Sequence, residues 1–106
     1  MFQIVYTYTK DDSTEFQEQD ILSITSLSDP CTQDKSSYNV TQQSTNFLGF
    51  DAVLSEDGRT LTVTESWIDS AAYFTYESTR IVPEGASEFK NNVKEGFSLT
   101  LTSRTI

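Results

Sequence analysis

The sequence predicts an α+β fold in which a four-stranded antiparallel sheet carries helices on one face. Four segments alternate apolar and polar side chains with the period of a β-strand, and these are residues 2–9, 47–54, 59–67 and 97–104. Segments with helix-capping signals lie between some of these strands. Because 106 residues is the usual size of one domain, we expect a single domain over residues 1–106.

Each predicted strand has one apolar face. These faces carry Phe2, Ile4, Tyr6 and Tyr8; Leu48, Phe50, Ala52 and Leu54; Leu61, Val63, Glu65 and Trp67; and Phe97, Leu99 and Leu101. The opposite faces carry mainly hydroxyl groups, with a few larger side chains such as Val5, Phe47 and Val53. Turn-forming residues at 55–58 predict a hairpin between the second and third strands.

Two helices are predicted after the third strand. Asp69 has the side chain of a good N-cap for a helix over 70–80. A second helix is indicated over 86–95, with Gly96 at the usual stop position.

The segment between the first two strands is less clearly patterned. A capping-box pattern and loosely helical apolar spacing favour a helix over 13–27, although β-branched residues at 21–25 also fit a short strand. Residues 28–46 are polar and without period, which predicts a long surface loop.

The predicted order of strands and helices is that of a split βαβ unit, the ferredoxin-like arrangement. One layer of helices covers only one face of such a sheet. The other face is too mixed for a core and too apolar for a purely wetted surface, so we expect a homodimer that packs two of these faces together.

Charge and cysteine content narrow the functional classes. Sixteen acidic and seven basic residues give a net charge of −9, which repels nucleic acid and anionic lipid surfaces. No apolar run approaches the roughly 20 residues of a membrane span, and the first ten residues lack signal-peptide features, so we expect a cytoplasmic protein. Cys31 is the only cysteine, which excludes an intramolecular disulfide and suits a reducing compartment.

The run TESWIDSAAY, from Thr64 to Tyr73, resembles the third strand and following helix of the antibiotic biosynthesis monooxygenase-like, dimeric α+β barrel superfamily. The resemblance covers mainly residues 47–80. It implies a homodimer whose two sheets form a barrel, often around a small aromatic or polyketide-like ligand. Many members carry a histidine nine positions after the tryptophan, where this chain has Tyr76. Because the chain has no histidine at all, imidazole acid–base catalysis is excluded.

Glu65 and Tyr76 are the candidate catalytic residues. Glu65 is an ionisable group on an apolar strand face, where burial would raise the pKa of its carboxyl group. A structural role, at the rim of the sheet or paired with Arg80 or Arg59, is the commoner alternative. Tyr76 enters as the residue in place of the family's histidine.

Trp67, Tyr6 and Tyr73 are the candidate ligand-binding residues, because aromatic side chains can line a pocket for a flat ligand. Aromatic residues at strand and helix spacing are more often part of a core. No metal site or cofactor is expected, since the acidic turn at 55–58 lacks the spaced oxygen ligands of a calcium loop and no phosphate-binding loop is present.

Two functions fit these observations. The favoured one is a non-catalytic dimeric module with a ligand-binding, accessory or structural role, and the short, Ser-, Thr- and Asn-rich chain suggests a viral source. The alternative is a cofactor-free monooxygenase or isomerase acting on a small aromatic substrate. An enclosed, hydroxyl-lined pocket would favour the enzyme, and a filled core would favour the module.

Overall fold

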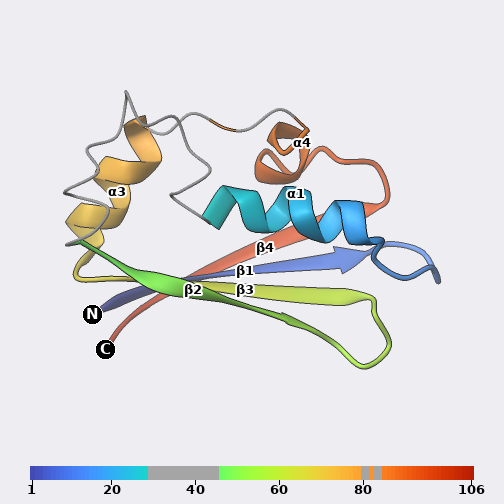
Figure 1. Ribbon diagram of the computed structural model, residues 1–106, viewed down its shortest axis with the longest axis horizontal. Coiled ribbons are helices and arrows are strands. Elements are labelled where there is room, and N and C mark those ends of the chain that lie inside the picture. The colour runs from blue at the N-terminus through green and yellow to red at the C-terminus, as the bar shows by residue number, and fades with distance from the viewer. Residues whose placement is uncertain (29–45, 80–81, 83–84) are drawn as a thin grey trace.

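A computed structural model of the chain (Figure 1) describes residues 1–28, 46–79, 82 and 85–106. Its elements in chain order are β1 (Phe2–Lys10), α1 (Glu18–Ser28), β2 (Phe47–Leu54), β3 (Thr60–Trp67), α3 (Ser70–Thr79), α4 (Ser87–Lys90) and β4 (Phe97–Thr105). All four predicted strands are present close to their predicted bounds.

The strands form one antiparallel sheet with the order β2-β3-β1-β4. The helices α1, α3 and α4 all lie on one side of this sheet, as Figure 1 shows. This arrangement confirms the predicted ferredoxin-like α+β fold. We call the side that carries the helices the covered face and the other side the open face.

Side chains of the two central strands form the floor of the core. The strict alternation in β1 and β3 places every second side chain on the covered face and buries it. The buried apolar residues are Phe2, Ile4, Tyr6, Tyr8, Phe16, Ile24, Leu27, Leu61, Val63, Trp67, Ala72, Tyr73, Tyr76, Ala86 and Phe89. Full burial of one large apolar side chain stabilises a fold by about 1.5–3 kcal/mol, so this cluster dominates the stability of the chain.

β2 departs from its predicted alternation. A β-bulge between Phe47 and Gly49 shifts the pairing of β2 with β3 by one residue. Phe47 therefore lies on the covered face, with its ring 4.9 Å from that of Trp67, and not on the opposite face as predicted. Leu48 is moved to the open face and is more than half exposed, at 53 %.

The helix predicted over 13–27 is present but starts five residues late, as α1. The Phe16 N–H donates to the carbonyl of Gly58 in the β2–β3 turn at 2.8 Å, which holds residue 16 outside the helix. Asp20 then caps the helix by accepting from the Gln17 N–H at 3.2 Å. The alternative strand at 21–25 is wrong, because those residues lie within α1.

The helix predicted over 86–95 is wrong in length, because only the single turn α4 forms. Asn92 takes the left-handed conformation, with φ of 57°, and ends the helix. The N–H groups of Asn92 and Val93 return to the carbonyls of Phe89 and Glu88 at 3.2 and 2.9 Å, the pattern of a Schellman motif. An asparagine four residues before the expected Gly96 therefore supplies the stop.

The helix predicted over 70–80 is α3, and Asp69 caps it as expected by accepting from the Ala72 N–H at 2.8 Å. Of the loop predicted over 28–46, residues 29–45 lie outside the described residues. Ser28 is the buried last residue of α1 and not part of a loop. The Asn46 carbonyl accepts from the Ile68 N–H at 2.9 Å.

The β2–β3 turn is fixed by the carboxylate of Asp57. Its Oδ1 accepts from the Ser55 hydroxyl at 2.6 Å and from the Arg59 N–H at 3.0 Å. These hydrogen bonds, that of Ser55 first, lower the pKa of Asp57 from its ordinary value. A carboxyl group whose folded pKa is lowered stabilises the fold above its unfolded pKa, and this contribution is lost as the pH falls through the folded pKa.

We therefore expect Asp57→Asn to be less stable than the wild type at pH 7, with a difference that shrinks below about pH 4 as the carboxyl group is protonated. Urea unfolding at a series of pH values measures it. Glu56→Gln, which removes the same charge from the same turn, is the matched control and should stay close to the wild type. An Asp57→Asn deficit that is constant from pH 7 to pH 2 would contradict the assignment.

Candidate functional site

The candidate site residues are brought together between the covered face and the helices. Tyr6 comes from β1, Glu65 and Trp67 from β3, and Tyr73 and Tyr76 from α3. All five are buried. Their clustering follows from two periods, since residues two apart share a strand face and residues three apart share a helix face.

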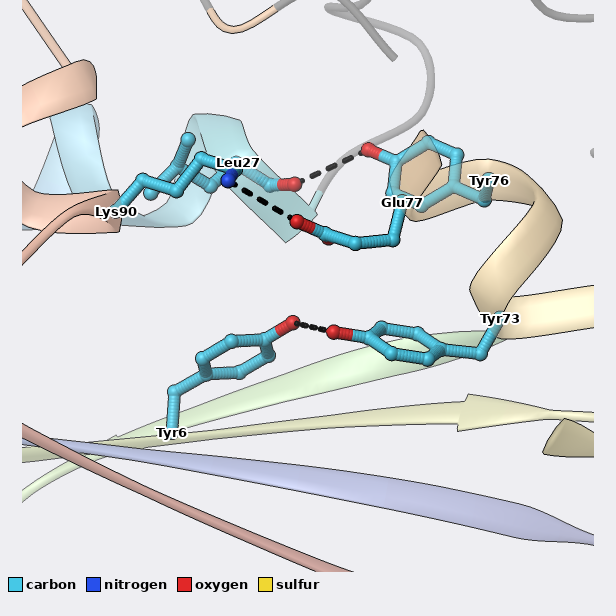
Figure 2. Close-up of polar contacts among 6 residues, drawn as sticks. All are labelled: Tyr6, Leu27, Tyr73, Tyr76, Glu77 and Lys90. Atoms are coloured by element: carbon cyan, nitrogen blue, oxygen red, sulfur yellow. Dashed lines mark hydrogen bonds and ion pairs between the residues drawn. The ribbon is translucent and has the colours of Figure 1, made fainter. Parts of the chain in front are cut away.

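Tyr6 and Tyr73 form a buried pair of hydroxyl groups. Their oxygens are 3.0 Å apart, and Figure 2 shows the two rings pointing toward one another from the sheet and from α3. Burial raises the pKa of Tyr6, and the nearby charge of Glu65 raises it further. Tyr6 therefore remains protonated at physiological pH and is suited to donating or sharing a hydrogen bond, not to acting as a base.

Glu65 and Trp67 form the second polar pair. They are two residues apart on β3, so both project from the covered face. The indole N–H of Trp67 donates to Oε1 of Glu65 at 3.1 Å, and both side chains are almost completely inaccessible, at 0 % and 1 % exposed. The carboxylate thereby satisfies the indole N–H, which would otherwise be costly to bury.

Tyr76 connects α3 to the end of α1. Its hydroxyl donates to the carbonyl of Leu27 at 3.1 Å, and its ring lies 5.0 Å from that of Trp67. A helix leaves its last carbonyls without intrahelical partners, and this hydroxyl satisfies one of them. In this arrangement the proton of Tyr76 is directed at the backbone of α1 and not at the Tyr6–Tyr73 pair.

An ion pair lies farther from the sheet than the two tyrosine hydroxyls. Lys90 of α4 approaches Glu77 of α3, with Nζ 3.1 Å from Oε1, and both side chains are about one quarter exposed. Figure 2 shows this pair above the Tyr6–Tyr73 pair. It joins the two helices over this part of the core.

The cavity at this site is small. It measures about 50 Å³ and is lined by Tyr6, Tyr8, Leu27, Ser28, Tyr73, Glu77, Lys90 and Leu101. That volume accommodates water, whereas a cavity of about 150 Å³ is needed to hold benzene. An aromatic ligand would therefore require the Glu77–Lys90 pair and the helices that carry it to move.

Glu77 and Lys90 were missed by the sequence interpretation. Glu77 lies four residues after Tyr73, on the same face of α3, so helical periodicity provided a signal for it. Lys90 had none, because the position of the one-turn α4 depends on tertiary contacts. Among the described residues, no group of acidic side chains and cysteine is arranged to hold a metal ion. Arg80 and Cys31 lie outside these residues.

Comparison with known proteins finds the same fold. No protein-family model matches the chain, and no curated protein matches it. A crystal structure from Deinococcus radiodurans, described as that of a "putative antibiotic biosynthesis monooxygenase", is similar over 100 % of this chain and 92 % of that chain, with a TM-score of 0.60 and 13 % identity. Protein SO0527 from Shewanella oneidensis is similar over 97 % of this chain and 90 % of that chain, with a TM-score of 0.52 and 14 % identity.

The sequence resemblance in the run from Thr64 to Tyr73 is thus confirmed as a likeness of fold. The structural likeness covers nearly the whole chain. At such low identity they carry no residue roles. No helix in the described ranges is long and apolar enough to cross a membrane.

The Tyr6–Tyr73 hydrogen bond generates a prediction. A double-mutant cycle of Tyr6→Phe and Tyr73→Phe should give a coupling energy of about 1 kcal/mol, because each single change leaves the other buried hydroxyl without this partner. Chemical unfolding of the four proteins measures the coupling. Tyr6→Phe combined with Tyr76→Phe is the matched control and should be nearly additive, because the Tyr76 hydroxyl donates to the Leu27 carbonyl. Additive effects for Tyr6 and Tyr73 would show that the two hydroxyls do not interact in solution.

Proposed function

We propose that this protein is a single-domain, non-catalytic homodimeric module whose aromatic cluster is a core and not a substrate site. The small cavity is the observation that carries the proposal. With about 50 Å³ beside Tyr6 and Tyr73, the covered face is filled in the way that favours a module over an enzyme. The hydrogen bonds from Trp67 to Glu65 and from Tyr76 to Leu27 serve packing directly, since they satisfy buried polar groups.

The open face supports the homodimer. It carries Val5, Leu48 and Val53 among its hydroxyl-bearing residues, and Leu48 and Val53 are more than half exposed, at 53 % and 55 %. No helix of the described residues covers this side of the sheet, as Figure 1 shows. Two such faces packed about 10 Å apart would remove these apolar side chains from water.

Light scattering behind a sizing column tests the dimer. Twice the chain mass of 12.0 kDa is 24.0 kDa, and we expect that value at micromolar concentrations. A mass of one chain up to about 100 µM, roughly the range in which weak dimers still form, would refute the homodimer.

A second function is favoured by one observation, the Tyr6–Tyr73 pair close to the carboxylate of Glu65. In a cofactor-free oxygenase or isomerase, Glu65 would accept a proton from the substrate. Tyr6 and Tyr73 would donate hydrogen bonds to the oxygen atom of the substrate. Tyr76 would need to leave the Leu27 carbonyl before it could handle that proton. Trp67 would pack against the substrate ring. The structural likeness to the Deinococcus radiodurans protein adds weight to this alternative.

Binding of a two-ring phenol separates the two functions. We expect 2-naphthol at 1 mM, about a thousand times the dissociation constant of a micromolar ligand, to leave the melting temperature unchanged and to cause no oxygen uptake. A saturable stabilisation would contradict the filled core, and oxygen uptake that Glu65→Gln abolishes would contradict the non-catalytic module and favour the enzyme. Leu22→Gln, at an exposed position of α1 away from the cavity, is the matched control for the substitution.

A further inference from the structure

The open face carries only two charged side chains on its four strands, one on each edge strand. They are Asp51 on β2 and Arg104 on β4. The other open-face positions set by the strand register carry uncharged side chains, mainly serine and threonine. The chain has twenty-three charged residues, sixteen acidic and seven basic. Because so few of them lie on the open face, Asp51 and Arg104 are the positions at which charge could contribute to binding there.

Arg104 is held in place by a chain of hydrogen bonds across three strands. Its Nε donates to Oε1 of Gln3 at 2.6 Å, and Nε2 of Gln3 donates to the Ser66 hydroxyl at 3.0 Å. The two terminal nitrogens of the guanidinium group are the donors that match a carboxylate in a two-pronged pair. A preoriented cation of this kind requires little ordering before it binds an anionic partner.

Arg104 and Asp51 line the same groove of about 420 Å³ but cannot pair with each other. They lie on the two edge strands of the sheet, three strand spacings apart, which amounts to about 14 Å at 4.7–4.9 Å per spacing. Within the described residues, the ion pairs join other side chains. Both charged side chains therefore line the open-face groove and are available to a molecule that binds there.

The strand register places the two charges two residues apart along the strands, a distance of about 7 Å. Asp51 is opposite Thr64, Thr64 is opposite Val5, and Val5 is opposite Thr102. Arg104 is two residues from Thr102, on the same face of β4. A two-fold axis parallel to the strands, between β1 and β3, would place β2 of one copy over β4 of the other. Asp51 would then lie over Thr102, about 7 Å along the strand from Arg104.

We propose that the open face binds a second copy of this chain about that axis, and that Arg104 of each copy pairs with the partner's Asp51. The inference rests on the proposed homodimer and specifies its geometry. A two-fold axis forms both ion pairs at once. It also places β1 of one copy over β3 of the other, so that Val5 faces Thr64 of the partner subunit. The Arg and Asp side chains would together bridge the gap of about 10 Å between packed sheets, with the longer Arg104 side chain leaning two residues along β4 toward Thr102.

Charge reversal tests the pairing, with sedimentation equilibrium of the full chain as the measurement. Asp51→Arg and Arg104→Asp should each raise the dimer dissociation constant roughly tenfold or more, because each places two like-charge contacts in the interface. The double variant reverses both partners and should return to within about threefold of the wild type. At 1 M salt, where the screening length is about 3 Å, the single variants should approach the wild type.

Glu56→Arg is the matched control, since it makes the same charge change as Asp51→Arg at the exposed β2–β3 turn, and it should not weaken the dimer. Circular dichroism confirms that each variant folds, and Asp51→Asn with Arg104→Gln provides neutral substitutions if a reversal does not fold. The neutral variants should each weaken the dimer less than the reversals do.

Three results would overturn the pairing, and they are distinguishable. Single variants that dimerise like the wild type, or a double variant no better than the singles, would overturn it while leaving the homodimer intact. A wild-type chain that is monomeric at every concentration would overturn both the pairing and the proposed homodimer, and would leave the groove to another occupant.

Discussion

A core rich in tyrosine and tryptophan is stable only if every buried hydroxyl and N–H group finds a partner, and this requirement organises the structure. Trp67 is the most buried large side chain, and its indole N–H is satisfied by Glu65 from the same strand. The Tyr6 and Tyr73 hydroxyls satisfy one another across the gap between sheet and helix. Tyr76 uses its hydroxyl to hold the end of α1. The placement of α1 and α3 over the sheet thus depends on polar contacts inside an otherwise apolar layer.

The two faces of the sheet differ in composition and in the space they leave. The covered face is filled by aromatic rings and keeps only a cavity of water-sized volume. The open face has a larger groove, small hydroxyl-bearing side chains and one charge at each edge. The proposed dimer therefore uses the open face. The residue types that resemble a catalytic site lie on the covered face.

Strand alternation was sufficient to predict the sheet, because a period of two assigns each side chain to a face without knowledge of its neighbours. The exceptions arose where one tertiary contact decided the outcome. The bulge at Phe47 depends on pairing with β3, and the start of α1 depends on a hydrogen bond from Phe16 to a turn far along the chain. Local sequence carries little information about either.

In the candidate site, too, local sequence patterns predicted some contacts and tertiary packing decided the others. Glu65 and Trp67 could be placed together because they share a strand face, and Tyr73 and Tyr76 because they share a helix face. The Tyr6–Tyr73 contact joins elements whose docking no local pattern specifies. Tyr76 entered through the family resemblance alone, and no local pattern indicated that its hydroxyl would meet the carbonyl of Leu27.

The central position of β1 sets the order in which the sheet can form. β1 is the first strand to be synthesised, yet both of its neighbours come later, and the contacts of Gln3 with Ser66 and with Arg104 span 63 and 101 residues of sequence. Such long-range pairing slows folding, because the chain entropy is lost before the contacts form. One edge of β1 therefore stays unpaired until β4 is in place, and the sheet is complete only when the last of the four strands pairs beside the first.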